Sequence, residues 1–359
     1  MISKRLIPLV LLAAMLGGAV YWWRNSGGVG FSWEKFVAAG AQVDWRWLAA
    51  AGTLVLVAYV LRGLRWGVMM KPVCERPNLV QLIGAQFTGF AAVAILGRPG
   101  ELVRPSLIAS QQGVSVQSQM AIWFLERIFD LLLVMALFGF SLSQLGAGTL
   151  ERVGPTLGWL LKSGGGVAGV SAAACVGLIL SLRYLCDPIR KLVGWIAGWL
   201  PAVIGSKLEW LYRSFAEGIG AIKSTGEILV ILLYSVAHWA VIVGMFYCLC
   251  QGFGPTSRLS ALDGMVIYGF IAFGSIVQLP GVGGGIQIVT ALVLTELYGV
   301  ELEAAGMMGI LVWMVGFAVA VPLGLGYALI FGLRFGELRG MAKDSSARSQ
   351  DSSTAKYQS

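Results

Sequence analysis

The feature that most constrains the fold of this sequence is a series of apolar runs, each about 20 residues long. A run of this length crosses the hydrocarbon core of a bilayer as an α-helix. Hydrophobic residues make up 57% of the 359-residue chain and charged residues only 12%, whereas about 25% of the residues in soluble domains are charged. The sequence therefore predicts an all-α polytopic membrane protein.

Two of the apolar regions, residues 79–116 and 264–298, are interrupted by segments rich in glycine and proline, at 97–105 and 280–285. Each is predicted to be a re-entrant pair of half-helices that enters the membrane, breaks and returns to the same side. About six full spans are expected besides these pairs, at residues 6–23, 47–70, 119–145, 166–185, 228–250 and 304–333.

The placement of lysine and arginine supports the re-entrant interpretation, or an even number of crossings in the first broken region. With both broken regions re-entrant and the N-terminus cytoplasmic, most basic residues outside the apolar runs lie on the cytoplasmic side, as the positive-inside rule expects. If residues 79–96 crossed alone, the basic segment from Arg183 to Lys223 would lie outside. Both termini are therefore predicted to be cytoplasmic. The net charge of +8 then indicates which loops face the cytoplasm and an affinity for anionic lipid. No nucleic-acid partner is expected.

Each broken region stands between two long helices, which suggests repeat halves at 47–145 and 228–333. Interrupted segments at corresponding places in two halves indicate an inverted repeat with a substrate site at its interface. Chance is the alternative, because glycines are common in membrane helices. Residues 187–223 alternate apolar and basic side chains and are expected to form a cytoplasmic amphipathic segment. The polar residues 336–359 are expected to be a disordered cytoplasmic tail.

Ionisable residues inside the apolar runs are the strongest indication of function, since each costs about 2.5 to 3.5 kcal/mol at a helix centre. Arg62 and Arg65 share a helix face through their i, i+3 spacing, although snorkelling to the head groups is a simpler explanation. Glu126 and Asp130 also share a face, and Arg127 is spaced to reach Asp130. These groups must pair or face water.

The two breaks are candidate anion sites. Glu101 stands where it could cap the half-helix after the first break. Arg98 and Arg104 flank the same helix end, and guanidinium groups and free backbone N–H groups both suit phosphate. The second break offers either an anion nest or a simple tight turn, with the candidate residues Gly283, Gly284, Gly285 and Gln287.

No metal-ligand cluster, P-loop or nucleophile motif is found in the sequence. The five cysteines have no Cys-x-x-Cys spacing. We therefore expect no catalytic residue, no metal and no cofactor. His238, the only histidine, is expected to be buried and hydrogen-bonded rather than a general base.

Four ordered motifs resemble the lysylphosphatidylglycerol synthase transmembrane (flippase-like) family, UPF0104, over roughly residues 5–335. They are Arg-x-x-Arg-Trp at 62–66, Gly-Arg-x-Gly-Glu-x-x-Arg-Pro at 97–105, Glu-Arg-x-x-Asp at 126–130 and Pro-Gly-x-Gly-Gly at 280–284. The resemblance implies that residues 1–335 form a flippase-like domain of the bacterial inner membrane that moves a polar or anionic phospholipid or envelope lipid between leaflets.

The sequence departs from the fused members of that family because no soluble aminoacyl-transferase domain follows residue 335. It is therefore not expected to be an enzyme, and a separate lipid-modifying enzyme could be its partner. Many relatives also carry a glutamate shortly after the glycine break. Gln287 and Thr290 stand there in this chain, which argues against a proton carrier at that place.

We expect the lipid phosphate to be held in a cavity between the broken regions by Arg62, Arg65, Arg98 and Arg104. In this hypothesis Glu101, Glu126 and Asp130 orient the arginines and accept a proton if transport is ion-coupled. One alternative is an intramembrane enzyme acting on a lipid or polyprenyl phosphate, with Glu126 or Asp130 as general base. A second alternative is a transporter of a small soluble anion. A third is an accessory or scaffold role, which would leave the buried charges unexplained.

Overall fold

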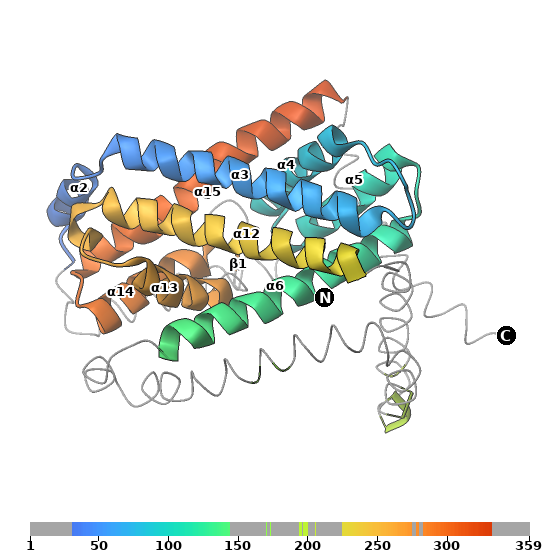
Figure 1. Ribbon diagram of the computed structural model, residues 1–359. Helices are drawn as coiled ribbons and strands as arrows, with labels where there is room; N and C mark the ends of the chain where they lie inside the picture. Colours follow the sequence, from blue (N-terminus) through green and yellow to red (C-terminus); the bar gives the residue numbers. More distant parts are fainter. Residues whose placement is uncertain are drawn as a thin grey trace, which may run out of the picture.

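The computed structural model describes residues 31–143, 225–274, 278–279 and 283–331, with a few isolated positions between 170 and 205. Long helices lie side by side in one bundle (Figure 1). Within these residues four helices are long and apolar enough to cross a membrane: α3 (Trp45–Met70), α4 (Leu79–Leu96), α12 (Thr225–Gln251) and α15 (Leu302–Ile330). The prediction of an all-α polytopic membrane protein is confirmed.

The predicted spans at 47–70, 228–250 and 304–333 correspond to α3, α12 and α15. The span predicted at 119–145 corresponds to α6 (Val116–Ser143), a long helix that carries three charged residues. The predicted spans at 6–23 and 166–185, the amphipathic segment 187–223 and the tail 336–359 lie outside the described residues, apart from isolated positions.

The first broken region is a re-entrant pair. α4 ends at Gly97, whose φ of 72° interrupts the helix, and the chain turns through η1 (Arg98–Leu102) into α5 (Val103–Gln112). The two outer ends are joined through Gln112. Its side chain accepts a hydrogen bond from the Asn78 backbone N–H at 3.0 Å and donates one to Gln81 Oε1 at 2.7 Å. The pair therefore begins and finishes at the same end of the bundle.

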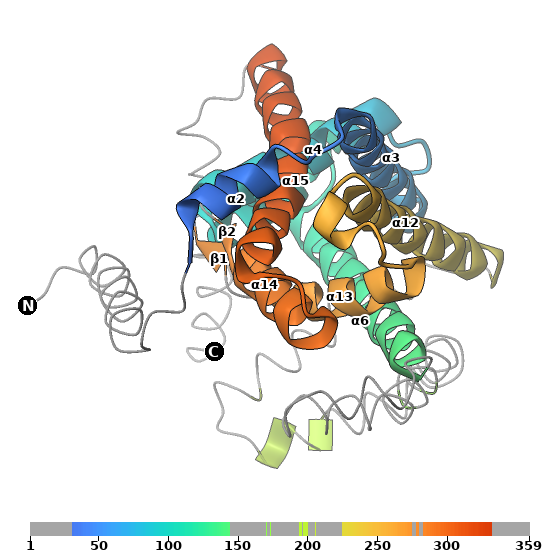
Figure 2. The ribbon, with the colours of Figure 1, turned by 90° about the vertical axis from the view of Figure 1, so that its left-hand side faces the viewer.

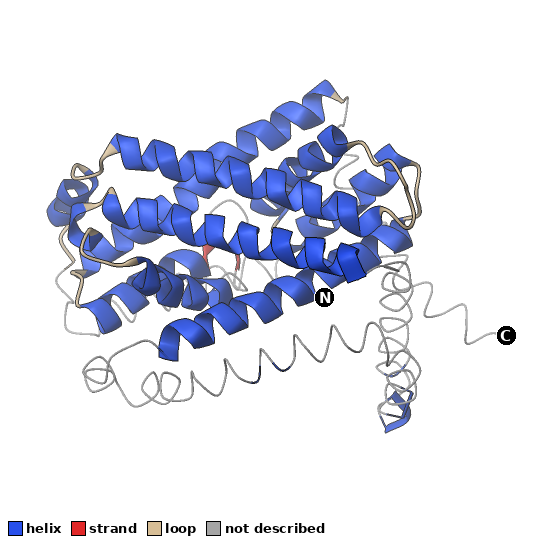
Figure 3. Ribbon diagram, viewed as in Figure 1, coloured by secondary structure: helices blue, strands red, loops and turns tan. Residues whose placement is uncertain are grey.

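The second broken region is also a re-entrant pair, made of α13 (Ala261–Gly274) and α14 (Gly285–Tyr298). Arg258 Nη2 donates to the Tyr298 carbonyl oxygen at 2.7 Å, which joins its outer ends. Between the helices lies a short antiparallel hairpin, β1 (Gln278–Leu279) and β2 (Gly283–Gly284), near the middle of the bundle (Figure 3). This hairpin was not anticipated, because two-residue strands leave no alternating pattern to recognise.

The two pairs come from opposite ends of the bundle. The Asp44 backbone N–H donates to the Gly252 carbonyl oxygen at 2.8 Å, so the start of α3 lies beside the end of α12. The first pair follows the end of α3, whereas the second follows the end of α12. Figure 2 views the bundle from the end where α2 (Trp33–Gly40), α13 and α14 lie.

Apolar packing fills the space between the helices. One core joins α3, α12, α15 and the second pair, and a smaller one joins α3, the first pair and α6. α15 contacts both pairs at glycines. A Cβ added at Gly324 would press on the carbonyl group of Phe87 in α4, and one at Gly309 would lie 2.8 Å from the carbonyl oxygen of Gln287 in α14. These contacts fix each pair against α15.

We predict that Gly309→Ala and Gly324→Ala each lower the free energy of unfolding by about 1–3 kcal/mol, because the added methyl group meets backbone that cannot move aside. Gly326→Ala is the matched control on the same helix, since an added Cβ there has no neighbouring heavy atom within 4 Å. Thermal unfolding in detergent micelles measures the difference. Equal melting temperatures for all three variants would contradict this packing.

Candidate functional site

A network of buried charges lies where α3, α5, α6 and α12 meet. Arg65 of α3, only 1% exposed, bonds to both carboxylates of α6. Its Nη1 donates to Asp130 Oδ1 at 2.7 Å and to Ser235 Oγ at 2.9 Å, and its Nη2 donates to Glu126 Oε1 at 2.8 Å. Both terminal nitrogens of the guanidinium therefore have acceptors, while Arg65 Nε has none among the described residues.

Glu126 is fully buried and is shared by further arginines. Arg104 of α5 donates to Glu126 Oε2 and to Gln86 Oε1 of α4. Its guanidinium also lies 4.5 Å from the ring centroid of Trp66, a cation–π contact. The Trp66 Nε1–H donates in turn to Gln119 Oε1 at 2.8 Å. One carboxylate thus connects the first re-entrant pair to α3 and α6.

Arg62 has the loosest contacts with this network. Its Nε lies 3.4 Å from Glu126 Oε1, and its Nη2 is 3.5 Å from Glu126 Oε2. Its side chain is 19% exposed, more than the side chains of Arg65 and Arg104. Among the three arginines that contact Glu126, Arg62 is therefore the one best able to turn toward a ligand.

Arg127 does not form the contact with Asp130 that helical spacing suggested. Its Nη2 lies 3.6 Å from Glu101 Oε2 on the first re-entrant pair, and its guanidinium lies 5.9 Å from the ring of Trp123. Asp130 instead accepts a hydrogen bond from Arg65 of α3. Helical spacing can identify only a partner on the same helix. In the structure, Arg127 and Asp130 each pair with a residue of another element.

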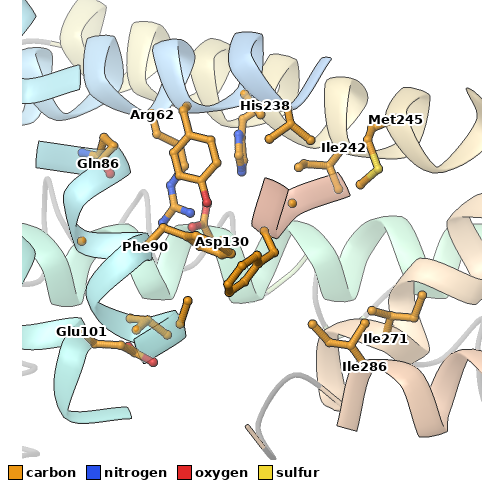
Figure 4. Close-up of a pocket in the computed structure, with 18 of the residues that line it drawn as sticks. Arg62, Gln86, Phe90, Glu101, Asp130, His238, Ile242, Met245, Ile271 and Ile286 are labelled. Carbon is orange, nitrogen blue, oxygen red and sulfur yellow. The ribbon is translucent and has the colours of Figure 1, made fainter. Parts of the chain in front are cut away.

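Beside the network lies a cavity of about 340 Å³ that has a polar end and an apolar end (Figure 4). The polar end is formed by Arg62, Gln86, Glu101, Arg104, Arg127 and Asp130. The apolar end is formed by residues such as Ile242, Met245, Ile271 and Ile286. Both re-entrant pairs contribute, so the tips of the two pairs face one space. Among the described ion-paired side chains around the cavity there is one more guanidinium than carboxylate. The guanidiniums are those of Arg62, Arg65, Arg104 and Arg127, and the carboxylates are those of Glu101, Glu126 and Asp130.

Several polar atoms on the cavity wall have no hydrogen-bond partner among the described residues. They are Arg62 Nε, Gln86 Nε2, Trp123 Nε1, His238 Nδ1 and Trp239 Nε1. His238 is buried as expected, but the hydrogen bond expected for it is missing at Nδ1. Sequence reasoning missed Gln86, Trp123 and Trp239. A glutamine in the middle of an apolar run was the signal available for Gln86.

The remaining candidate residues lie in different places. Arg65 and Glu126 stand behind the cavity wall and bind other protein groups rather than the open space. The described residues that line the cavity include Ile286 but neither Gly285 nor Gln287. Gly283 and Gly284 form β2, and Gln287 Oε1 accepts from the Gly284 N–H at 2.7 Å, so this amide oxygen is bound to the protein's own backbone. The side chain of Arg98 lies outside the described residues.

Comparison with known families and proteins gives a match over most of the chain. The family model described as the lysylphosphatidylglycerol synthase TM region matches residues 6–324. A glycosyltransferase, AglD of Haloferax volcanii, is 27% identical over 165 residues. That match covers 41% of this chain and only 26% of the relative's length. No solved structure matches.

We predict that Arg65→Gln lowers the free energy of unfolding by about 3–5 kcal/mol, because it removes the guanidinium that holds Asp130 and takes one of three from Glu126. Arg127→Gln is the matched control and should cost less than about 1 kcal/mol, since the Arg127 side chain is 44% exposed. Thermal unfolding and the yield of monodisperse protein measure the two effects. Similar losses in both variants would show that the network does not carry the stability assigned to it.

Proposed function

This chain belongs to the lysylphosphatidylglycerol synthase transmembrane family, and we propose that it binds the head group of an anionic membrane lipid in the cavity and moves it between leaflets. The observation that carries the proposal is the amphipathic cavity. Among the described side chains, its polar end has one guanidinium in excess of its carboxylates, and its other end is apolar. A membrane lipid complements both ends, because its phosphate is negatively charged and the start of its acyl chains is apolar.

The charge distribution supports phosphate as the anchored group. Glu126 and Asp130 hold Arg65 and Arg104 by close hydrogen bonds, whereas Arg62 has only distant contacts and faces the cavity. A phosphodiester near Arg62 would receive a charge-assisted hydrogen bond in a site of low dielectric constant. Neutralising the excess charge would also offset part of the cost of keeping it inside a membrane.

The two re-entrant pairs supply a route for movement between leaflets. We take the halves 47–145 and 228–333 as an inverted repeat, with the cavity between them and its pairs coming from opposite membrane faces. Rocking of one half against the other would then open the cavity to each leaflet in turn. The protein would stand in the bacterial inner membrane with both termini in the cytoplasm, as the distribution of basic residues indicates.

An intramembrane enzyme is the second candidate. The observation that favours it is the partial match to a relative named as a glycosyltransferase. The acidic residues at the cavity argue for binding instead, because Glu126 and Asp130 are engaged with arginines and a general base must be available to substrate. A small-anion transporter would leave the apolar end of the cavity without a role.

The test is lipid movement in proteoliposomes that contain an acyl-labelled phosphatidylglycerol whose outer-leaflet label is bleached chemically. The wild-type protein should move label between leaflets, and Arg62→Gln should slow this about tenfold or more, the loss of one charged hydrogen bond. Arg46→Gln, at an exposed position on the same helix, is the control and should retain the wild-type rate.

Mass spectrometry of the recovered lipid separates the two candidates, since an enzyme changes the mass of the lipid and a flippase only its leaflet. Equal rates in Arg62→Gln and wild type would overturn the proposed role of the cavity. A change in lipid mass would favour the enzyme.

A further inference from the structure

We infer that the cavity selects a lipid whose single negative charge is a phosphodiester and whose head group beyond it is neutral and hydroxyl-bearing, and that it disfavours head groups with an ammonium. This inference rests on the proposed function and names its substrate class. It is carried by the hydrogen-bonding groups on the cavity wall, both those that lack partners and those that already have them.

The cavity-wall atoms that lack a hydrogen-bond partner among the described residues are all nitrogens, and most can only donate. One of them, Arg62 Nε, lies 3.4 Å from Glu126 Oε1 in an ion pair. Arg62 Nε, Gln86 Nε2, Trp123 Nε1 and Trp239 Nε1 are donors, and His238 Nδ1 is a donor or an acceptor according to its tautomer. Gln86 is 2% exposed and His238 6% exposed, so bulk water does not freely satisfy them. Buried donors without partners cost free energy. The fitting occupant is therefore rich in acceptor oxygens.

The carboxylates near the cavity are already engaged. Both oxygens of Asp130 accept from Arg65, at 2.7 and 3.2 Å. Glu126 is shared by three arginines, and Glu101 is paired with Arg127 at 3.6 Å. An ammonium group would have to displace a guanidinium to gain a carboxylate, and it would add to a site that already has a positive charge in excess. That is unfavourable at low dielectric constant.

The aromatic rings do not compensate by forming an open cage for a cation. Trp239 lies edge to face with His238, at 5.9 Å between ring centroids, and with Tyr268 at 6.2 Å. Tyr59 is stacked on Phe87 at 4.7 Å. The ring faces are partly covered by neighbouring rings, so cation–π binding of an ammonium is weak here.

The donors also fall into two groups by charge. Arg62 of α3 and Arg104 of α5 are charged donors, whereas Trp239 of α12 donates an uncharged N–H, and His238 of the same helix lies beside Arg62 (Figure 4). A phosphodiester held at Arg62 would place the hydroxyl groups beyond the phosphate toward His238 and Trp239 of the adjacent helix. Hydroxyl oxygens accept from the indole and amide N–H groups, and a hydroxyl can also donate to an imidazole nitrogen.

The experiment compares the affinities of the purified full-length protein for three lipids with the same acyl chains, measured by native mass spectrometry. Phosphatidylglycerol and phosphatidylmethanol are both monoanionic phosphodiesters, and only the first has hydroxyl groups. Phosphatidylethanolamine has an ammonium in their place. Phosphatidylglycerol should bind about threefold to tenfold tighter than phosphatidylmethanol, the effect of a single hydrogen bond, and tighter still than phosphatidylethanolamine.

Variants of His238 and Trp239 on α12 test the assigned groups. His238→Leu and Trp239→Phe should bring the affinity ratio of phosphatidylglycerol to phosphatidylmethanol close to one, while each lipid still binds. His238→Gln keeps a hydrogen-bonding group and should preserve the preference. Trp45→Phe removes an exposed indole, 74% exposed, and should change nothing.

Equal or tighter binding of phosphatidylethanolamine or of lysylphosphatidylglycerol would overturn the inference and leave the proposed function standing. An unchanged ratio in both His238→Leu and Trp239→Phe would overturn it as well. If no lipid binds to the wild-type protein, the proposed function itself fails and the inference fails with it.

Discussion

The structure depends on one shared carboxylate. Glu126, buried in the middle of α6, contacts the guanidinium groups of Arg62, Arg65 and Arg104. A lone carboxylate in a bilayer would be prohibitively costly, and so would three lone arginines. Their pairing, together with that of Arg65 and Asp130, offsets part of that cost and brings α3 and α5 to α6. The position of the first re-entrant pair, and therefore the polar wall of the cavity, follows from this contact.

The two re-entrant pairs are held by different forces. The first is fixed by ion pairs at Arg104 and Glu101. The second is held by apolar packing and by the close approach of Gln287 to Gly309 on α15. Both pairs are therefore held in place around the cavity, the first by directional charged contacts and the second by close packing against α15.

Much of this arrangement could be predicted from sequence, because length, hydropathy and glycine-rich breaks are local properties. They located the long helices and both re-entrant pairs. The partners of the charges could not be predicted in the same way. Helical spacing pointed Arg127 at Asp130, whereas the fold pairs them with Glu101 and Arg65. The cavity donors were missed for a related reason: a tryptophan or histidine in an apolar run is unremarkable until the neighbouring helices show that its nitrogen has no partner.

The most direct test of this account is a lipid-bound structure of the protein in nanodiscs of phosphatidylglycerol, determined by electron cryomicroscopy. We expect phosphate density within hydrogen-bonding distance of Arg62 at the polar end of the cavity, and acyl density leading away past Ile242 and Ile286. Acyl chains lying against the arginines, or a cavity closed to lipid with all lipid density on the outer surface, would contradict the claim that the excess positive charge is there to bind a lipid phosphate.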